Sequence, residues 1–284
     1  MTKVDERATG AAVVRGSTIR AMDGYVDIHS HVLPGIDDGA PTMDEALAML
    51  RTAAASGTTT IAATPHLGAG FPQVDVHELA GRCDELSREA AKGGVGVRLV
   101  SGAEVSLAWA LDATRDERAL ATYGQQGRDL LIETPSATVA GLDALLYQLR
   151  AVGLRITLAH PERSGEFQRQ PDRLAALAQQ GVLLQIDAAS LLAHPRRSPA
   201  SALAWQLCAT GLVHAIASDA HRAGTWRPVT RLSDAADAAA ARFGPDRAAW
   251  LAATAPAAII AGAELPDPPP IERPRKRRWQ RRRA

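Results

Sequence analysis

The sequence predicts an α/β fold, a distorted (β/α)7 barrel in which seven parallel strands alternate with helices. Short apolar segments alternate along the chain with longer segments whose apolar residues recur at helical spacing, which favours a parallel sheet covered by helices. Polar residues with metal-binding side chains follow several predicted strands, as in barrels whose active site lies at the carboxyl ends of the strands. A regular barrel has eight strands, so we expect a distorted one.

Seven segments are predicted to be strands because they are rich in apolar or β-branched side chains and are bounded by turn residues. They are residues 25–31, 58–64, 97–100, 129–133, 154–159, 182–186 and 213–217. The first ends in the histidine pair of the run Tyr25 to His31, and the second is the β-branched run Thr58 to Thr64.

The segments between the strands have an apolar face at helical spacing, and several are followed by a glycine that ends a helix. We expect helices at residues 43–56, 76–92, 139–152, 171–180, 199–210, 231–243 and 246–260. Thr42 and Glu45 predict a capping box at the start of the first, and Ser198-Pro199 begins the fifth. Residues 107–122 indicate a helix followed by a loop.

The chain has 284 residues, 46% of them hydrophobic, enough for one domain with a large core. We predict this domain at residues 23–264, after a flexible leader at 1–22 that lacks the apolar run of a signal peptide. The alanine-rich run 248–263 is shorter than the ~20 apolar residues of a membrane span, so it predicts a packed helix. Cys83 and Cys208 are too few for a disulfide framework, which favours a cytoplasmic protein.

Charge is unevenly distributed, although the net charge is only +1. Residues 273–284 hold eight of the 32 basic residues and no acidic one, which leaves 24 basic against 31 acidic residues, or −7, in the rest of the chain. With the proline-rich run 266–270, this predicts a disordered tail at 265–284 that is held away from the acidic body. We expect weak contact of the tail with an anionic membrane, at the inner face, and no binding to nucleic acid, for which the chain offers no recognition fold.

Residues that can bind a metal follow the predicted strands at five places. Residues two apart on a strand point to the same side, so His29 and His31 can converge on one ion. Because the carboxyl ends of parallel strands share one face of a barrel, we expect the other candidates in the same place. The candidate ligands are His29, His31, Asp38, His66, Glu104, His160, Asp219 and His221.

Imidazole nitrogens and carboxylate oxygens, without thiolates, suit Mn²⁺, Zn²⁺ or Fe better than a structural zinc site. These ligands exceed the needs of one ion, so we expect two or three metals with Glu104 as a bridge. Arg163 and Arg227 lie on loops above the predicted site, where a planar guanidinium can hold a phosphate group. Asp187 ends a strand and is expected to orient a ligand or a loop. His214 is expected to be a core residue with a satisfied hydrogen bond.

Spacing argues against two other chemistries. A cysteine-dependent phosphatase needs Cys-x5-Arg, but Glu89 follows Cys83 at that distance and His214 follows Cys208. An amidohydrolase also opens with His-x-His on a barrel strand, but its common form uses a carbamylated lysine at a strand end. No lysine of this chain lies at such a position; they are Lys3, Lys92 and Lys276.

Six groups of motifs follow one another along the chain. They are Asp27-Ile-His-Ser-His31 with Gly35-Ile-Asp-Asp-Gly39, Ala63-Thr-Pro-His66, Gly102-Ala-Glu104, Leu131-Ile-Glu-Thr-Pro135, Ala159-His-Pro-Glu-Arg163 and Ala217-Ser-Asp-Ala-His221. Together they resemble the PHP (polymerase and histidinol phosphatase) superfamily. Within it, the chain is similar to bacterial tyrosine-protein phosphatases of capsule and exopolysaccharide biosynthesis, the CpsB/CapC type, from about Tyr25 to Ile260.

The resemblance implies a PHP-type barrel with a trinuclear, usually manganese-dependent site; zinc, iron and cobalt are the alternatives. It assigns one metal to His29, His31, Glu104 and Asp219. It assigns the second to His66, Glu104 and His160, and the third to Asp38 with His66 or His221. The catalytic residues that it implies are Arg163, Arg227, Asp219 and His221. The chain departs from the family pattern at Asp187, where relatives tend to have Asn, and in its leader and basic tail.

The expected function is therefore metal-dependent hydrolysis of phosphotyrosine on a protein, such as a membrane-bound tyrosine kinase that regulates polysaccharide synthesis. One alternative is a PHP phosphoesterase that acts on a small phosphomonoester such as histidinol phosphate. Another is a regulatory module that binds a kinase or a membrane through its tail.

Overall fold

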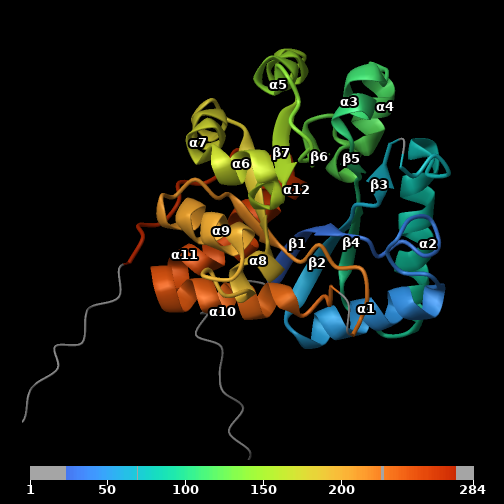
Figure 1. The fold of residues 1–284 in the computed structure, drawn as a ribbon. Helices are drawn as coiled ribbons and strands as arrows, with labels where there is room; N and C mark the ends of the chain where they lie inside the picture. The colour runs from blue at the N-terminus through green and yellow to red at the C-terminus, as the bar shows by residue number, and fades with distance from the viewer. Residues whose placement is uncertain (1–23, 69, 225–226, 273–284) are drawn as a thin grey trace, which may run out of the picture.

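The computed structural model describes residues 24–68, 70–224 and 227–272 (Figure 1). In these ranges the seven predicted strands are confirmed to within two residues at each end. They are β1 (Tyr25–Ser30), β2 (Thr58–Ala63), β4 (Arg98–Ser101), β6 (Asp129–Glu133), β7 (Arg155–Ala159), β8 (Leu183–Asp187) and β9 (Ala215–Ala217). The sequence pattern did not predict the two-residue strands β3 (His66–Leu67) and β5 (Glu104–Val105).

The strands form two parallel sheets, in the orders β1-β2-β4 and β3-β5-β6-β7-β8-β9. Two short breaks, at residues 64–65 and 102–103, carry the chain from β2 to β3 and from β4 to β5, and so from one sheet to the other. On the opposite side, the His31 amide donates a hydrogen bond to the Ala220 carbonyl just after β9 (2.8 Å). The fold is α/β with parallel sheets, which confirms the predicted class.

Helices surround the strands (Figure 1). In the first half of the chain they are α1 (Met43–Ala55), η1 (Val76–Glu78), α2 (Leu79–Lys92), α3 (Leu107–Asp112), α4 (Arg115–Ala121), η2 (Tyr123–Gln125) and α5 (Leu142–Ala151). In the second half they are η3 (Pro161–Arg163), α6 (Gly165–Arg169), α7 (Pro171–Gln179), α8 (Ala188–Leu192), α9 (Pro199–Ala209), α10 (Arg231–Phe243), α11 (Pro245–Ala249), the π-helical η4 (Trp250–Thr254) and α12 (Ala255–Ile260).

Three local expectations differ from the structure. The segment before β6 forms two helices, because the Thr114 hydroxyl accepts from the Glu117 amide (3.2 Å) and caps α4. The last predicted helix is divided into α11, η4 and α12. At α1, the Thr42 hydroxyl accepts from the Glu45 amide (3.3 Å), but the Glu45 carboxylate accepts from the Ala223 amide (2.8 Å) and does not complete the box. Glu45 thereby ties α1 to the loop after β9.

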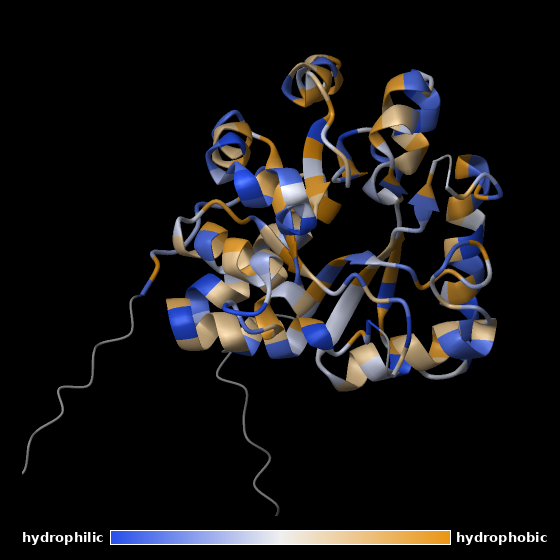
Figure 2. Ribbon diagram, viewed as in Figure 1, coloured by the Kyte–Doolittle hydropathy of each residue, from blue (hydrophilic) through white to orange (hydrophobic). Residues whose placement is uncertain are grey.

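The buried apolar residues form two clusters. The larger packs the helices against the strands, and Figure 2 shows both hydrophobic and hydrophilic residues on the outer helices, as expected for helices with one packed face. The smaller cluster takes residues from all seven longer strands. It consists of Val26, Ile28, Ala62, Val100, Tyr123, Leu131, Ala159, Leu183, Ala215, Ala217, Ile259 and Ile260. The strands of both sheets therefore share one apolar interior.

The described start of the predicted tail, residues 265–272, lies against the body. This segment has no regular secondary structure, but the Trp250 indole donates to the Pro266 carbonyl (3.0 Å), and the Glu272 amide donates to the Phe243 carbonyl (2.9 Å). The proline-rich segment is thus packed rather than held away, because these backbone groups find partners on α10 and η4. The leader and the basic residues 273–284 lie outside the described residues. Within the described ranges, no helix is long and apolar enough to cross a membrane.

Candidate metal centre

The eight candidate ligands come together at the carboxyl ends of the strands. His29 lies on β1 and His31 directly follows it, while Asp219 and His221 follow β9. His66 begins β3 and Glu104 begins β5, at paired positions of neighbouring strands. His160 follows β7, and Asp38 lies in the loop between β1 and α1. The two sheet breaks are therefore the positions at which His66 and Glu104 are turned toward β1.

Four side chains surround one point. The Nε2 atom of His29 lies 3.2 Å from His31 Nε2, 3.2 Å from Glu104 Oε2 and 3.5 Å from Asp219 Oδ1. His31 Nε2 lies 3.5 Å and 3.4 Å from the same two oxygens. Ligands at ~2.1 Å from a tetrahedral ion lie about 3.4 Å apart, so this spacing fits one bound ion.

A second group faces the Asp38 carboxylate. Its Oδ1 atom lies 3.3 Å from His221 Nε2 and 3.7 Å from His66 Nε2. One ligand atom from each of His31, Asp38, His66 and His221 falls within 4.8 Å of the others. This group is next to the first and shares His31 with it.

A third group is centred on Glu104. His66 Nδ1 lies 3.1 Å from Glu104 Oε2, and His160 Nε2 lies 2.8 Å from Glu104 Oε1. Glu133, at the end of β6, joins His66 and Glu104 within 4.8 Å. Glu133 was not predicted as a ligand from the sequence, although its position at the end of a predicted strand was an available signal.

Other groups orient the ligating imidazoles. His29 Nδ1 lies 2.9 Å from Gln185 Oε1, and His31 Nδ1 lies 2.7 Å from Asp37 Oδ2. Each contact occupies Nδ1 and leaves Nε2 directed at the other ligands. Neither partner was predicted from the sequence: Gln185 is a buried polar residue inside a predicted strand, and Asp37 is adjacent to Asp38.

The buried charges of the site attract a positive partner. Burial opposes protonation of His29, but the carboxylates of Glu104 and Asp219 outweigh it and raise the pKa of the ring to about 9. Burial likewise acts to raise the pKa of Glu104, yet His29 and His160 hold that pKa well below its usual range. Both carboxylates are thus anionic in an interior that would otherwise neutralise them.

The residues present fit divalent metal ions. Glu104 Oε2 is buried and accepts no hydrogen bond among the described residues, although nitrogens of three histidines lie within 3.5 Å of it. An oxygen that is buried without a donor is costly, and a cation between it and these nitrogens would satisfy it. The donor set contains nitrogen and oxygen only, as Mn²⁺, Zn²⁺ or Fe²⁺ can use.

Both expected arginines are directed at the site. Arg163 Nη1 donates to Asp219 Oδ2 (2.8 Å), and Arg227 Nη1 lies 3.3 Å from the same oxygen. Asp187 Oδ2 lies 3.8 Å from Arg163 Nη1, and its Oδ1 accepts from the Ala189 amide at the start of α8 (2.8 Å). Asp187 therefore caps α8 and lies near Arg163.

Three non-glycine residues at the site have left-handed backbones: His160 (φ 36°), Asp219 (φ 48°) and Arg227 (φ 44°). This conformation is uncommon for residues with a Cβ atom, and residues that adopt it cluster at active sites. At these positions it turns the side chain at the end of a strand, or on the loop after it, toward the ligand cluster. The uncommon conformation supports a functional reading of all three.

A small cavity opens beside the ligands. Its volume is about 170 Å³, and its lining includes Asp38, His66, Phe71, Glu104 and Glu133. The Phe71 ring stacks on His66, with centroids 4.7 Å apart and an 8° angle between the planes. The cavity thus combines charged ligands with an aromatic wall.

The cysteines lie elsewhere and are poor nucleophiles. Both are buried, and burial raises the pKa of Cys83 and of Cys208 to about 12. A thiol with this pKa is not ionised at neutral pH. The structure thus agrees with the exclusion of a cysteine mechanism.

Comparisons with known proteins identify a family and several relatives. A family model described as "Capsular polysaccharide synthesis, CpsB/CapC" matches residues 25–261. Tyrosine-protein phosphatase YwqE of Bacillus subtilis is 31% identical over 201 residues, 70% of this chain and 78% of that protein. The putative tyrosine-protein phosphatase CapC of Staphylococcus aureus is 32% identical over 197 residues, 69% of this chain and 76% of that protein.

A solved structure is also similar along most of the chain. It is described as one of the "unique metal-dependent tyrosine phosphatases" YwqE from Bacillus subtilis and CpsB from Streptococcus pneumoniae, with a TM-score of 0.74 and 28% identity. The match covers 87% of this chain and all of the other. The lactonase Lmo2620 from Listeria monocytogenes, at a TM-score of 0.55 and 12% identity, is similar in fold alone.

Proposed function

The chain belongs to the CpsB/CapC family of capsular polysaccharide synthesis, and we propose that it is a metal-dependent tyrosine-protein phosphatase. The reaction is hydrolysis of a phosphomonoester: water attacks phosphorus, the bond from phosphorus to the phenolic oxygen breaks, and tyrosine and inorganic phosphate are released. The observation that carries the proposal is the set of four ligand atoms at 3.2–3.5 Å, with two arginines beside them. The resemblance to phosphatases named above supports the same reaction.

The proposed cofactors are two or three divalent ions, with manganese first and zinc, iron or cobalt as alternatives. The first would be held by His29, His31, Glu104 and Asp219. The other two positions would use His66, Glu104 and His160 with Glu133, and Asp38 with His66 or His221. Glu104 would bridge, because its two oxygens face different histidines.

When bound, such ions would neutralise the phosphoryl oxygens and acidify the attacking water. Arg163 and Arg227 would bind the phosphoryl group by charge-assisted hydrogen bonds and stabilise its charge in the transition state. Both contact Asp219 in the structure, so a phosphate would exchange that contact for one with itself. His221, whose Nδ1 lies 2.8 Å from the Asp219 carbonyl, would keep Nε2 directed at the site.

Phosphotyrosine suits this site by its leaving group and its ring. A phenolate, with a parent pKa near 10, leaves more easily than an alkoxide, so general-acid assistance matters less. The stacked rings of Phe71 and His66 offer an aromatic wall beside the ligands, against which a phenyl ring can pack.

We infer that the two sheets together make one distorted seven-stranded barrel. The shared interior of the smaller core cluster supports this, because every longer strand contributes to it. The hydrogen bond from the Asp219 amide to the His29 carbonyl (2.9 Å) supports closure between β9 and β1.

The proposed partner is a phosphotyrosine protein, such as a membrane-bound tyrosine kinase. We propose a cytoplasmic location, with contact to the inner membrane face through the basic residues 273–284.

The test uses the full chain after reconstitution with Mn²⁺. We expect two or three equivalents of metal, hydrolysis of p-nitrophenyl phosphate that is abolished by a chelator, and loss of turnover in His29→Ala. Phosphotyrosine peptides should exceed phosphoserine peptides and histidinol phosphate in kcat/KM. Less than one metal equivalent together with chelator-resistant activity would contradict the metal mechanism. A tenfold preference for histidinol phosphate would instead assign a small-molecule substrate.

A further inference from the structure

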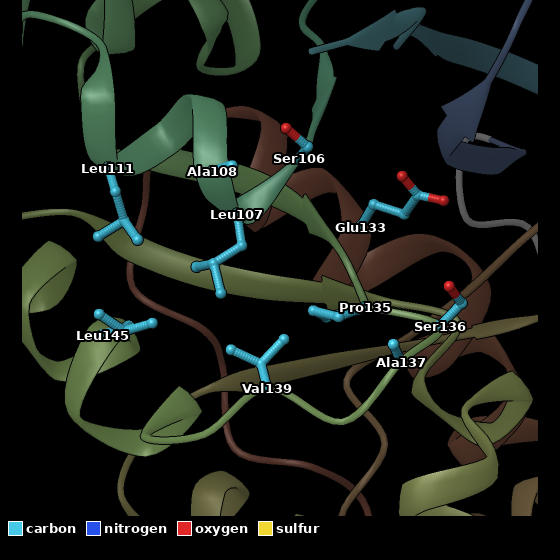
Figure 3. A pocket seen from close by; sticks show the side chains of 10 residues that line it. All are labelled: Ser106, Leu107, Ala108, Leu111, Glu133, Pro135, Ser136, Ala137, Val139 and Leu145. Atoms are coloured by element: carbon cyan, nitrogen blue, oxygen red, sulfur yellow. The ribbon is translucent and has the colours of Figure 1, made fainter. Parts of the chain in front are cut away.

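A larger, mostly apolar groove lies between α3 and the segment that connects β6 to α5 (Figure 3). Its volume is about 450 Å³, and the apolar side chains that line it include Leu107, Leu111, Val139 and Leu145. Figure 3 shows Leu111 and Leu145 at one end and Glu133 at the other. The groove is thus apolar over most of its length and polar at one end.

The polar end adjoins the candidate metal centre. Ser106 and Glu133 line both this groove and the 170 Å³ cavity beside the ligands. Glu133 is also within 4.8 Å of ligand atoms of His66 and Glu104. A molecule whose phosphate lies at the ligands therefore has the groove within reach of its neighbouring groups.

We propose that this groove binds an apolar side chain of the substrate protein, within two or three residues of the phosphotyrosine. The inference rests on the proposed phosphatase function and specifies its substrate class. The phenyl ring of the phosphotyrosine has its own wall, Phe71 and His66, in the smaller cavity. The groove, at about 450 Å³, is as large as a typical ligand pocket. It can therefore bind a neighbouring residue of the peptide.

The charge of the lining selects against other occupants. Of the ten lining residues only Ser106, Glu133 and Ser136 are polar, and none is basic. A second phosphate or an acidic side chain would find no basic partner in this lining, whereas leucine, isoleucine or phenylalanine would bury apolar area that is otherwise exposed to water. Burial of such a side chain corresponds to about tenfold or more in affinity.

The experiment compares two phosphotyrosine peptides that differ only in having leucines or serines on both sides of the phosphotyrosine. For the Mn²⁺-loaded protein we expect kcat/KM to be about tenfold higher for the leucine peptide. Ala108→Phe and Ala137→Phe each place a ring at an exposed position of the lining and should lower that ratio to about one. Ala144→Phe is the matched control, because Ala144 is an exposed alanine of α5 outside the lining, and it should keep the wild-type ratio.

Equal kcat/KM values for both peptides in the wild-type protein would overturn the inference. So would an equal loss of p-nitrophenyl phosphate and peptide hydrolysis in the two groove variants, since the groove would then receive the tyrosyl ring itself. Failure of the metal-loaded protein to hydrolyse p-nitrophenyl phosphate would overturn the phosphatase function, and the inference with it. The aryl phosphate thus separates the two failures.

Discussion

Single side chains outside the candidate ligand set hold the rings of His29 and His31. His29 and His31 each have Nδ1 occupied, by Gln185 Oε1 at 2.9 Å and by Asp37 Oδ2 at 2.7 Å. Such partners fix the tautomer and orientation of a ligating ring. The geometry of the centre therefore depends on β8 and on the loop after β1 as much as on the ligands.

Gln185→Leu should weaken metal binding without removing a ligand. The His29 Nδ1–H would lose its acceptor in the dry interior and the ring would lose its fixed tautomer, so we expect ~10- to 100-fold weaker Mn²⁺ binding. Mn²⁺ titrations followed by calorimetry and by p-nitrophenyl phosphate hydrolysis should both shift, and excess metal should restore most of the kcat. Gln185→Glu, which keeps an acceptor in place, should stay closer to wild type. An unchanged Mn²⁺ affinity in Gln185→Leu would contradict the orienting role.

His214 is half-buried, and it makes stability depend on pH. Its Nδ1 atom accepts from the Leu184 amide (3.2 Å), which confirms the expected satisfied hydrogen bond. Burial, with Arg247 and Arg155 nearby, lowers the pKa of His214 from 6.5 to about 4. Between pH 6.5 and 4 the unfolded chain binds more protons at this residue than the folded chain does. The free energy of unfolding therefore decreases as the pH falls from 6.5 to 4.

His214→Gln should make the free energy of unfolding decrease less as the pH falls. One proton gives a slope of at most ~1.4 kcal/mol per pH unit, and the glutamine does not titrate while it keeps an acceptor. Urea unfolding at pH 7, 6 and 5 with equal metal loading should show a smaller decline in the variant. Parallel declines in both proteins would show that His214 is not the titrating group.

The candidate ligands and their convergence could be predicted from the sequence, whereas the residues that contact their rings could not. His29 and His31 interrupt an apolar run at a strand spacing, and the other candidates follow strand ends, so local patterns expose them. Gln185 looks like any polar residue in a strand until the fold brings its side chain to His29. Its role depends on a contact between residues that are 156 positions apart, which no local pattern encodes.

At the scale of elements, the loop between β1 and α1 closes against the strand that it follows. The Ala40 amide donates to the His31 carbonyl (3.0 Å), and the Gly39 amide donates to Asp37 Oδ1 (2.9 Å). A Cβ atom at Gly39 would lie 2.1 Å from the His31 carbonyl oxygen and 2.4 Å from the His31 Cβ. Only glycine lets the loop approach closely enough to bring Asp37 and Asp38 to the site.

Gly39→Ala should therefore damage the centre through the loop. Backbone and Cβ atoms of His31 cannot move aside without displacing its ring, so we expect at least tenfold weaker Mn²⁺ binding and a loss of ~1–3 kcal/mol in the free energy of unfolding. Gly81→Ala is the control, because nothing lies within 4 Å of the added Cβ atom on α2, and alanine favours a helix. Binding isotherms and urea melts decide, and equal behaviour of the two variants would exclude the steric account.

The elements themselves were predicted better than their interruptions. The apolar runs give all seven longer strands, since burial on both faces leaves a clear composition signal. The division of two strands by the breaks at residues 64–65 and 102–103 depends on how the sheets turn toward each other. Likewise, the π-helical η4 interrupts a run whose composition reads as one helix.

At the scale of the whole molecule, the last twenty residues divide into a segment that contacts the body, 265–272, and a basic segment, 273–284. Residues 265–272 lie on the body through Trp250, Phe243 and Arg247, whose Nη1 donates to the Pro269 carbonyl (3.4 Å). The following residues, 273–284, carry eight of the 32 basic residues. The described part of the chain therefore ends at Glu272, in contact with α10.

Two truncations should separate these roles. A chain that ends at residue 272 should keep the Tm and the p-nitrophenyl phosphatase activity of the full chain but lose sedimentation with phosphatidylserine vesicles at low salt, because each basic residue near an anionic surface contributes ~1 kcal/mol. A chain that ends at residue 264 should also have a lower Tm, since the Trp250 indole and the Phe243 carbonyl lose their hydrogen-bond partners and Ile271 leaves the core.

Vesicles of neutral phosphatidylcholine are the control for charge. If the full chain fails to sediment with phosphatidylserine vesicles, the basic residues have no membrane role; if both truncated chains melt with the full chain, the packing of residues 265–272 adds nothing to stability.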